Sequence, residues 1–407
     1  MKRFNEVTYL PVEQSYFDHR QVRRHAGSWS LFAFGIGAVI TGEFSGWSPG
    51  LLEGGFGGLL VATIMVTVMC VAFCLSQAEL ATIMPFTGGG YAYARAALGP
   101  AWGAFAAFTQ VVCYVLLAAV ICINVADALG PVLTWALNGA EVPAPVIWIL
   151  LYALFVAVNC HGARLTFVII IATTLAACVV LVGYLAALYD GFNLALALDI
   201  PKGEVGSAWL PNGLSGIAWA IPFAIWFYVG IGAVPLAAEE SERPKKHIPR
   251  ALIGGMAVLA ILAFAVLVLN SGVAPGGRMI GMSSTPLLDA MATRFNDADA
   301  TVLLEVLSLT GGIATFHAIV YVYGRAIFAA SRAGYLPVWL SVTHPRRATP
   351  WRALAVGAAI GYALAVAITF GPDRHHGLNA VRLMRAQKAA DFSYVQVAPY
   401  QVFKPLF

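Results

Sequence analysis

Long apolar segments separated by short polar stretches run along most of this chain. They number nine and lie near residues 29–50, 56–79, 101–126, 146–162, 165–189, 214–238, 250–273, 301–331 and 352–370. About 20 apolar residues in a helix cross the hydrocarbon core of a bilayer. The pattern therefore predicts an all-α polytopic membrane protein. Its transmembrane domain spans 29–370, between an N-terminal segment at 1–28 and an atypical polar tail at 371–407.

The first apolar segment is predicted to be a discontinuous helix. Helix-breaking residues interrupt Leu31–Gly50, namely Gly35, Gly37, Gly42, Gly46 and Pro49. Its middle carries Glu43, and a charge at that depth costs roughly 2.5–3.5 kcal/mol on insertion scales. Irregular backbone inside a membrane is tolerated only where protein or a wet cavity surrounds it. The segment thus predicts a substrate site. The alternative is a glycine-packed helix whose glutamate is protonated or hydrogen-bonded.

The sixth segment is also predicted to be a discontinuous helix. It contains helix breakers and aromatic residues. The breakers are Pro222, Gly230, Gly232 and Pro235, and the aromatic residues are Trp219, Phe223, Trp226, Phe227 and Tyr228. Aromatic rings at a broken helix can hold a small cation by cation–π attraction, although ordinary packing is a serious alternative. The charged stretch that follows, residues 238–250, is expected to be solvated.

A short repeat relates the two broken segments. GIGAV occurs at Gly35–Val39 and again at Gly230–Val234. Broken segments at corresponding positions of two halves are a pointer to a transporter site. The first and sixth spans run in opposite directions, so the halves are predicted to be inverted five-helix repeats. The second repeat lacks its last helix.

Other candidate residues are less specific. His317, near the centre of the eighth span, can shuttle protons or be a packing residue. Glu79–Arg95, with one proline and three consecutive glycines, is predicted to be a re-entrant turn and a short surface helix. The six cysteines lie in apolar spans without a complete metal-ligand set, so they are expected to pack as hydrophobes, and neither a metal nor a cofactor is expected.

Composition and charge support a membrane protein and set its orientation. Charged residues are only 11% of the chain, against about 25% in soluble domains. The net charge of +4 does not indicate nucleic-acid binding, because the basic residues lie between spans. They gather on the side of the N-terminus, which predicts a cytoplasmic N-terminus in the cytoplasmic (inner) membrane. The basic residues of 371–407 break this rule, so a truncated or frame-shifted chain is expected, with a tail folded against the membrane as the alternative.

Four stretches give the chain a family resemblance. They are ITGEFSGW at 40–47, AELATIMPFTGGGYAYARAALGP at 78–100, AIWFYVGIGAVPLAAEESERPKKHIPRA at 224–251 and FHAIVYVYGRAIFAASRAGYLPVWLS at 316–341. With them the chain resembles the amino acid–polyamine–organocation (APC) superfamily, most closely its ethanolamine permease branch. The resemblance implies a LeuT-like fold with discontinuous helices 1 and 6. It also implies a substrate site formed by Ile40, Thr41, Gly42, Glu43, Trp226, Phe227, Tyr228 and Gly230.

The resemblance implies a permease for ethanolamine or a similar small amine, with Glu43 binding the ammonium group. An amino acid or polyamine permease, a membrane enzyme, a receptor and a non-functional fragment are the alternatives. The coupling ion, H⁺ or Na⁺, stays open because the fifth span lacks the lysine found in some proton-coupled relatives. Glu43 and His317 are candidates for proton coupling. No nucleic-acid partner is expected, and the oligomeric state is not predicted.

Overall fold

The structure, a computed structural model, describes residues 16, 20–203, 206–295 and 298–371. The sequence-based expectations for 372–407 and for most of 1–19 lie outside these residues. Within them the regular structure is helical, and the one β-bridge joins Ala26 to Ser241. Eight helices are long and apolar enough to cross a membrane, and a shorter apolar segment, Ser28–Phe44, supplies the first span. The all-α polytopic class is thereby confirmed.

The helices follow the predicted spans closely. In order they are α2 (Ser28–Gly37), α3 (Thr41–Phe44), α4 (Gly50–Ile83), α5 (Gly90–Leu98), α6 (Pro100–Ala136), α7 (Ala144–His161), α8 (Ala163–Leu188), η1 (Tyr189–Gly191), α9 (Leu194–Ala197), α10 (Gly213–Trp226), η2 (Ile231–Glu240), α11 (Pro244–Ser271), α12 (Gly277–Met282), α13 (Pro286–Phe295), α14 (Ala298–Arg332), η3 (Val338–Ser341) and α15 (Trp351–Phe370). Prolines and glycines set many of the ends. For example, Gly162 takes a φ of 150° between α7 and α8, a conformation that a side chain disfavours.

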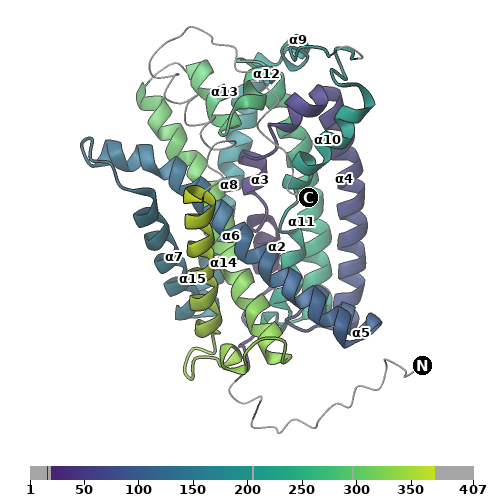
Figure 1. Cartoon of the computed structure of the whole chain (residues 1–407), viewed down its shortest axis with the longest axis vertical. Coiled ribbons are helices and arrows are strands. Elements are labelled where there is room, and N and C mark those ends of the chain that lie inside the picture. Colours follow the sequence, from purple (N-terminus) through teal and green to yellow (C-terminus); the bar gives the residue numbers. More distant parts are fainter. Residues whose placement is uncertain (1–15, 17–19, 204–205, 296–297, 372–407) are drawn as a thin grey trace.

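The packing relates the two halves reciprocally. Helix α4 of the first half packs along α10 of the second, and α11 of the second half packs along α2 of the first. Each half also carries short helices between its second and third long helices. These are α5 in one half and α12 with α13 in the other, and they lie at opposite ends of the molecule (Figure 1). This arrangement is the one that inverted repeats predict.

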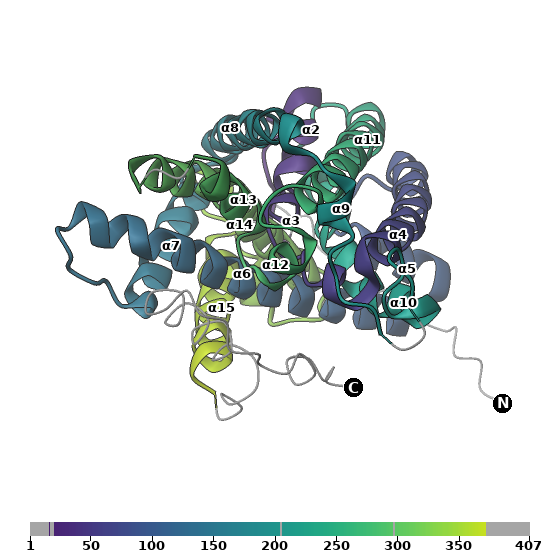
Figure 2. The same cartoon turned by 90° about the horizontal axis from the view of Figure 1, so that it is seen from above.

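Helix α14 is the central post of the bundle. It packs against α6, α8 and α15, and seen from above it lies inside the ring of other helices (Figure 2). Of its most apolar window, 67% is buried, against 28% for α15. A helix that is enclosed on most sides can fix the positions of several neighbours at once.

Two expectations from the sequence need correction. Residues 238–250 were expected to form a solvated loop. Charged side chains such as Glu242 and Lys245 are indeed exposed, but Glu240 and Ser241 are fully buried and α11 begins at Pro244. The reason is that arginines of α14 neutralise the glutamates, as described below. The first span was expected to reach residue 50, but its helices end at Phe44, where Ser45 takes an extended conformation and Gly46 follows with a φ of 91°.

Small residues bring α15 against α14. A Cβ atom on Gly357 would overlap the ring of Tyr323. We expect Gly357→Val to push the two helices apart, because overpacking a tight contact costs about 1–3 kcal/mol. Thermal unfolding in detergent, monitored by size-exclusion chromatography, should show a lower midpoint than for the parent protein. Ala359→Val, on the exposed face of the same helix, is the control and should leave the midpoint unchanged.

Candidate substrate-binding site

The first break lies between α2 and α3, where α14 satisfies part of the interrupted backbone. The Thr315 hydroxyl donates to the carbonyl oxygen of Gly37 at 2.8 Å and accepts from the N–H of Thr41 at 3.0 Å. The Thr41 hydroxyl in turn donates to the carbonyl oxygen of Gly311 at 3.0 Å. Helix α14 therefore replaces hydrogen bonds that a continuous helix would make internally, which a break at membrane depth requires.

The second break separates α10 from η2. Helix α10 ends at Trp226, and Gly230 takes a left-handed conformation with a φ of 108°. The chain continues in the tighter 3₁₀ form of η2, which contains Pro235. Glycine adopts a positive φ at little cost, whereas other residues pay for it. The glycine predicted to break the sixth span is thus the residue at which the backbone turns.

The two breaks contact each other backbone to backbone. A Cβ atom added to Gly42 would overlap the carbonyl oxygen of Trp226, and one added to Gly230 would overlap the carbonyl oxygen of Ala38. Each broken segment thus supplies the glycine that admits a carbonyl group of the other. The pairing brings Thr41, Gly42, Trp226 and Gly230 into one place, as the sequence-based hypothesis requires.

Glu43 lies beside this contact, fully buried. Neither of its carboxyl oxygens has a hydrogen-bond partner among the residues that the structure describes. The Tyr228 hydroxyl and the Cys178 thiol lie close enough to interact with it electrostatically. A buried carboxylate without a partner is costly, so this group requires a proton or a cation.

The aromatic residues of the second break have mixed surroundings. The Phe227 ring is fully buried and stacks on Trp47, with centroids 5.7 Å apart. The Tyr228 hydroxyl lies 2.6 Å from the Thr67 hydroxyl of α4. The Trp226 indole fills the space beside Gly46 and is only partly buried. Phe227 therefore packs as a core residue, whereas Tyr228 and Trp226 retain polar or accessible atoms near Glu43.

The structure does not bring His317 to the two breaks. Its ring stacks on Phe155 of α7, with centroids 5.0 Å apart and an angle of 26° between the planes. Thr315, two residues earlier, faces the first break, and helix positions two apart point to nearly opposite sides. Both ring nitrogens are buried without a hydrogen-bond partner in the described part of the chain. Ile40, by contrast, is fully buried within the first break itself.

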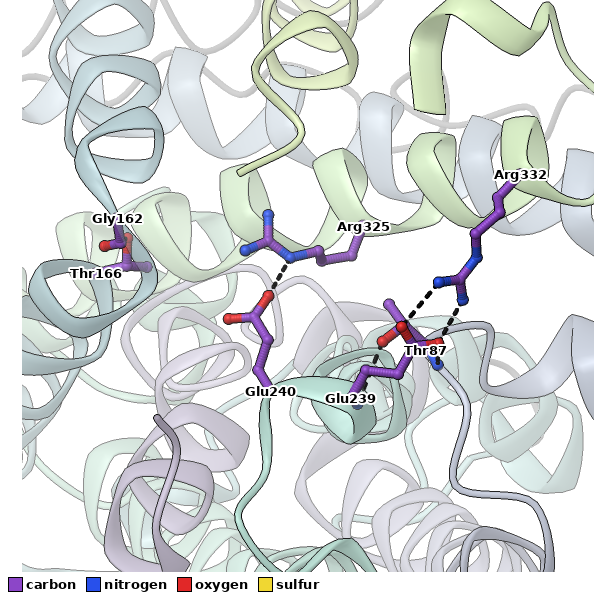
Figure 3. A network of polar contacts seen from close by, with 7 residues as sticks. All are labelled: Thr87, Gly162, Thr166, Glu239, Glu240, Arg325 and Arg332. Carbon is purple, nitrogen blue, oxygen red and sulfur yellow. Dashed lines mark hydrogen bonds and ion pairs between the residues drawn. The ribbon is translucent and has the colours of Figure 1, made fainter. Parts of the chain in front are cut away.

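Two ion pairs at the end of η2 were not anticipated from the sequence (Figure 3). In the inner pair, Arg325 Nε donates to Glu240 Oε1 at 2.5 Å, and both side chains are at most 1% exposed. In the outer pair, the Arg332 guanidinium binds both oxygens of Glu239, and these side chains are 16% and 22% exposed. The N–H of Thr87, after α4, also donates to Glu239 at 3.1 Å. The two arginines are seven residues apart, so they share a face of α14.

The segment before α2 joins the same cluster. The N–H groups of His25 and Ala26 both donate to the carbonyl oxygen of Glu240 at 2.8 Å, and the N–H of Glu242 donates to the Ala26 carbonyl oxygen at 3.1 Å. Glu240 therefore contacts α14 through its side chain and the segment before α2 through its backbone. A signal was present in the sequence: two adjacent glutamates after the second break, and two arginines inside the eighth span.

The region around Glu43 is closed. The carboxyl group has no exposed surface, and a hollow of about 440 Å³ that the structure contains lies elsewhere, lined by residues of α4 and α5 such as Leu80 and Tyr93. A solute reaches Glu43 only if the elements around it move. No group of three or more potential metal ligands occurs among the described residues.

These features define a class: a polytopic helical membrane transporter with two broken helices that meet at a buried acid. Residues 27–386 match the amino acid permease family, so the chain belongs to that family.

Curated relatives are transporters as well. The chain is 28% identical over 360 residues to an uncharacterized transporter of Rhizobium meliloti (strain 1021), covering 87% of this chain and 76% of the relative. It is 26% identical over 352 residues to the branched-chain amino acid permease BcaP of Bacillus subtilis (strain 168), covering 82% and 72%. It is 25% identical over 378 residues to the methylthioribose transporter of the same organism, covering 88% and 77%.

Among solved structures, the chain is similar to Mhp1, a nucleobase-cation-symport-1 family transporter in a closed conformation with bromovinylhydantoin bound. The TM-score is 0.47 and the sequence identity 16%, over 91% of this chain and 77% of that one.

The reciprocal glycine contacts give a direct test of the site geometry. We expect Gly42→Ala to destabilise the protein, because the new methyl group would overlap the Trp226 carbonyl oxygen and such overpacking costs about 1–3 kcal/mol. The measurement is the yield of monodisperse protein and its thermal midpoint in detergent. Gly183→Ala is the matched control. This residue is exposed and lies within α8, away from its ends, and no atom lies near the added methyl group, so the change should be neutral or slightly stabilising. Equal behaviour of the two variants would contradict the contact.

Proposed function

We propose that this protein is a secondary transporter for ethanolamine or a similarly small amine, which it moves by alternating access. The observation that carries the proposal is the buried, unpartnered carboxyl group of Glu43 beside two touching helix breaks. An ammonium group supplies both the charge and the hydrogen-bond donors that this carboxylate lacks. Membership of a transporter family supports the general class of activity.

The neighbours of Glu43 suit an amine. The carbonyl oxygen of Trp226, which faces Gly42, can accept a second hydrogen bond from the ammonium group. Tyr228, whose hydroxyl is held by Thr67, offers a polar atom to the hydroxyl end of the solute. In this proposal Ile40 and Thr41 form the adjoining wall, and Phe227 stays in the core against Trp47. Gly230 permits the close approach of the second segment.

The first break favours a solute without a carboxylate. Its N–H groups already have acceptors: Thr41 donates to Thr315, Gly42 to the Val39 carbonyl oxygen and Glu43 to the Ile40 carbonyl oxygen. A carboxylate bound there would have to displace these bonds. It would also meet the like charge of Glu43. Both effects disfavour an amino acid and support a simple amine.

An amino acid is the second candidate substrate, because the relative BcaP is a branched-chain amino acid permease. In that case Glu43 would bind the amino group, and a protonated Glu43 would reduce the repulsion of the carboxylate. Polyamines are a third possibility within the same class, since their cationic ends match Glu43 equally well. Competition between these solutes and ethanolamine distinguishes the candidates.

For energetic coupling we propose that Glu43 exchanges a proton for the amine. A carboxyl group that is sealed from water can hold either partner, so the two compete for one site. His317 stays a candidate for proton transfer through α7 and α14, although it lies away from the breaks. Coupling to Na⁺ is the alternative, and imposed pH and sodium gradients in proteoliposomes separate the two.

The proposed location is the cytoplasmic membrane, with the transporter domain at 29–370 and the N-terminus inside. Basic side chains gather at the end of the molecule where α5 and the segment before α2 lie, namely Arg20, Arg23, Arg24, Arg95, Arg164, Arg243, Lys245, Lys246, Arg250, Arg332, Arg346, Arg347 and Arg352. The opposite end has Lys202, Arg278 and Arg294 among the described residues. This asymmetry is typical of a cytoplasmic face.

Replacement of the proposed amine-binding group tests the function. We expect Glu43→Gln to lower the uptake of labelled ethanolamine into proteoliposomes by about 30-fold or more, because removing one member of a buried charge pair costs about 2–5 kcal/mol. Glu79→Gln, at the exposed end of α4, is the control and should transport like the parent protein. Parent-like uptake by Glu43→Gln would remove this residue from the site.

A competition assay tests the choice of substrate. We expect excess unlabelled ethanolamine to abolish the uptake of label, and excess leucine or glycine to leave most of it. The physical reason is the absence of a free N–H group in the first break for a carboxylate. Stronger competition by leucine than by ethanolamine would instead assign the protein to amino acid transport.

A further inference from the structure

The inner pair, Glu240–Arg325, connects three elements at the α5 end of the molecule. Arg325 belongs to the central post α14, and Glu240 ends η2, the half of the second broken segment that lies at this end. Through its carbonyl oxygen Glu240 also holds His25 and Ala26, just before α2. The first and second broken segments are thus tied to each other and to the post by one residue.

Close packing adds to this connection. A Cβ atom on Gly35 of α2 would lie 3.0 Å from the Val234 side chain of η2, so α2 and η2 are in direct contact. Helices α2 and η2 both extend from the breaks to the α5 end of the molecule, where the two ion pairs lie. Any path from Glu43 to the solvent at this end that passes between the broken segments and α14 must open the contact at Glu240.

The hydrogen bonding of the inner pair is incomplete. Arg325 Nε donates to Glu240 Oε1 and the guanidinium group lies over the Tyr321 ring, 4.2 Å from its centroid, but the Nη1 atom is buried without a hydrogen-bond partner among the described residues. The second oxygen of Glu240, Oε2, is also buried without a partner in that part of the chain. Buried charged groups with unsatisfied hydrogen bonds are costly. The closed arrangement is therefore held by a pair that water would stabilise as soon as the contact opened.

The outer pair, Glu239–Arg332, has the opposite character. Both carboxylate oxygens are bonded to the guanidinium group, the Thr87 N–H adds a third donor, and the pair is partly solvated. Its formation gains little from closure because water already reaches it. The two adjacent pairs thus differ in a way that separates a switchable contact from a static one.

We propose that the inner pair Glu240–Arg325 is the latch of a gate that closes the α5 end of the solute path, and that its incomplete hydrogen bonding keeps the closed and open states close in free energy. The outer pair clamps the end of η2 to α14 and to the turn after α4, and it contributes little to the opening equilibrium. The latch does not depend on which solute the protein carries.

The experiment measures the accessibility of one cysteine. Ser241→Cys places a reporter at a fully buried residue next to the latch, in a background in which the six native cysteines are replaced. A membrane-impermeant maleimide is added to the purified full chain in lipid nanodiscs, where both faces are accessible. The labelling rate is compared with the rate for a denatured sample.

The expected results separate a latch from a structural pair. Glu240→Gln leaves a buried arginine uncompensated in the closed state, so labelling should be at least about tenfold faster than in the parent. The matched control Glu239→Gln should change the rate by no more than about twofold, as for a partly solvated pair. The double variant Glu240→Leu with Arg325→Met replaces the pair by apolar side chains, which commonly preserves or increases stability. It should label no faster than the parent, because a gate without charges stays closed.

Folding is checked separately by the thermal midpoint of each variant. The exchanged pair Glu240→Arg with Arg325→Glu should label more slowly than either of its single substitutions, because the two charges are paired again. A folded Glu240→Gln protein that labels at the parent rate would overturn the proposal. So would a folded double apolar variant that labels faster than the parent. Because labelling needs no solute, a failure of the latch is distinguishable from a wrong assignment of the substrate.

Discussion

The need to satisfy the backbone inside a membrane governs the centre of this protein. Two helices are interrupted at mid-length, and each interruption leaves N–H and C=O groups that cannot form hydrogen bonds with water. The structure solves this with contacts between distant segments. Thr315 bridges the first break, and two glycines let each broken segment lie against a carbonyl group of the other. The breaks therefore depend on each other and on α14, and this mutual dependence places a small polar region in the middle of an apolar bundle.

The glutamates of this polar region and of the α5 end show how one residue type takes different roles. Glu240 is buried with an arginine, and Glu239 is 22% exposed and paired with another. Glu43 is buried with no partner in the described part of the chain. A paired buried acid holds elements together, whereas an unpaired one retains an unused capacity for a cation or a proton. This contrast, rather than the presence of an acid alone, is the basis for proposing that Glu43 binds the solute and that Glu240 belongs to the gate.

The position of α14 links these two regions. Its middle contacts the first break through Gly311 and Thr315, and its end carries Arg325 and Arg332. One rigid helix therefore contacts both the proposed solute site and the closed end. In a protein of the amino acid permease family, whose relatives are transporters, such a helix is a natural reference against which the broken segments can move.

The sequence by itself determined the class, the spans, the glycine breaks and the buried acid, because bilayer thickness and the cost of charge in lipid act on local composition. It also determined the family. Only the tertiary structure decided the partners. Glu240 was wrongly expected to be solvated with the rest of residues 238–250, since the chain around Glu240 does not indicate that its partner is an arginine 85 residues away. His317 and Thr315 are nearly adjacent in sequence, yet one faces α7 and the other bridges the break. Partner choice depends on how whole helices are rotated and packed against one another, and that information is spread over the entire bundle rather than held in any local pattern.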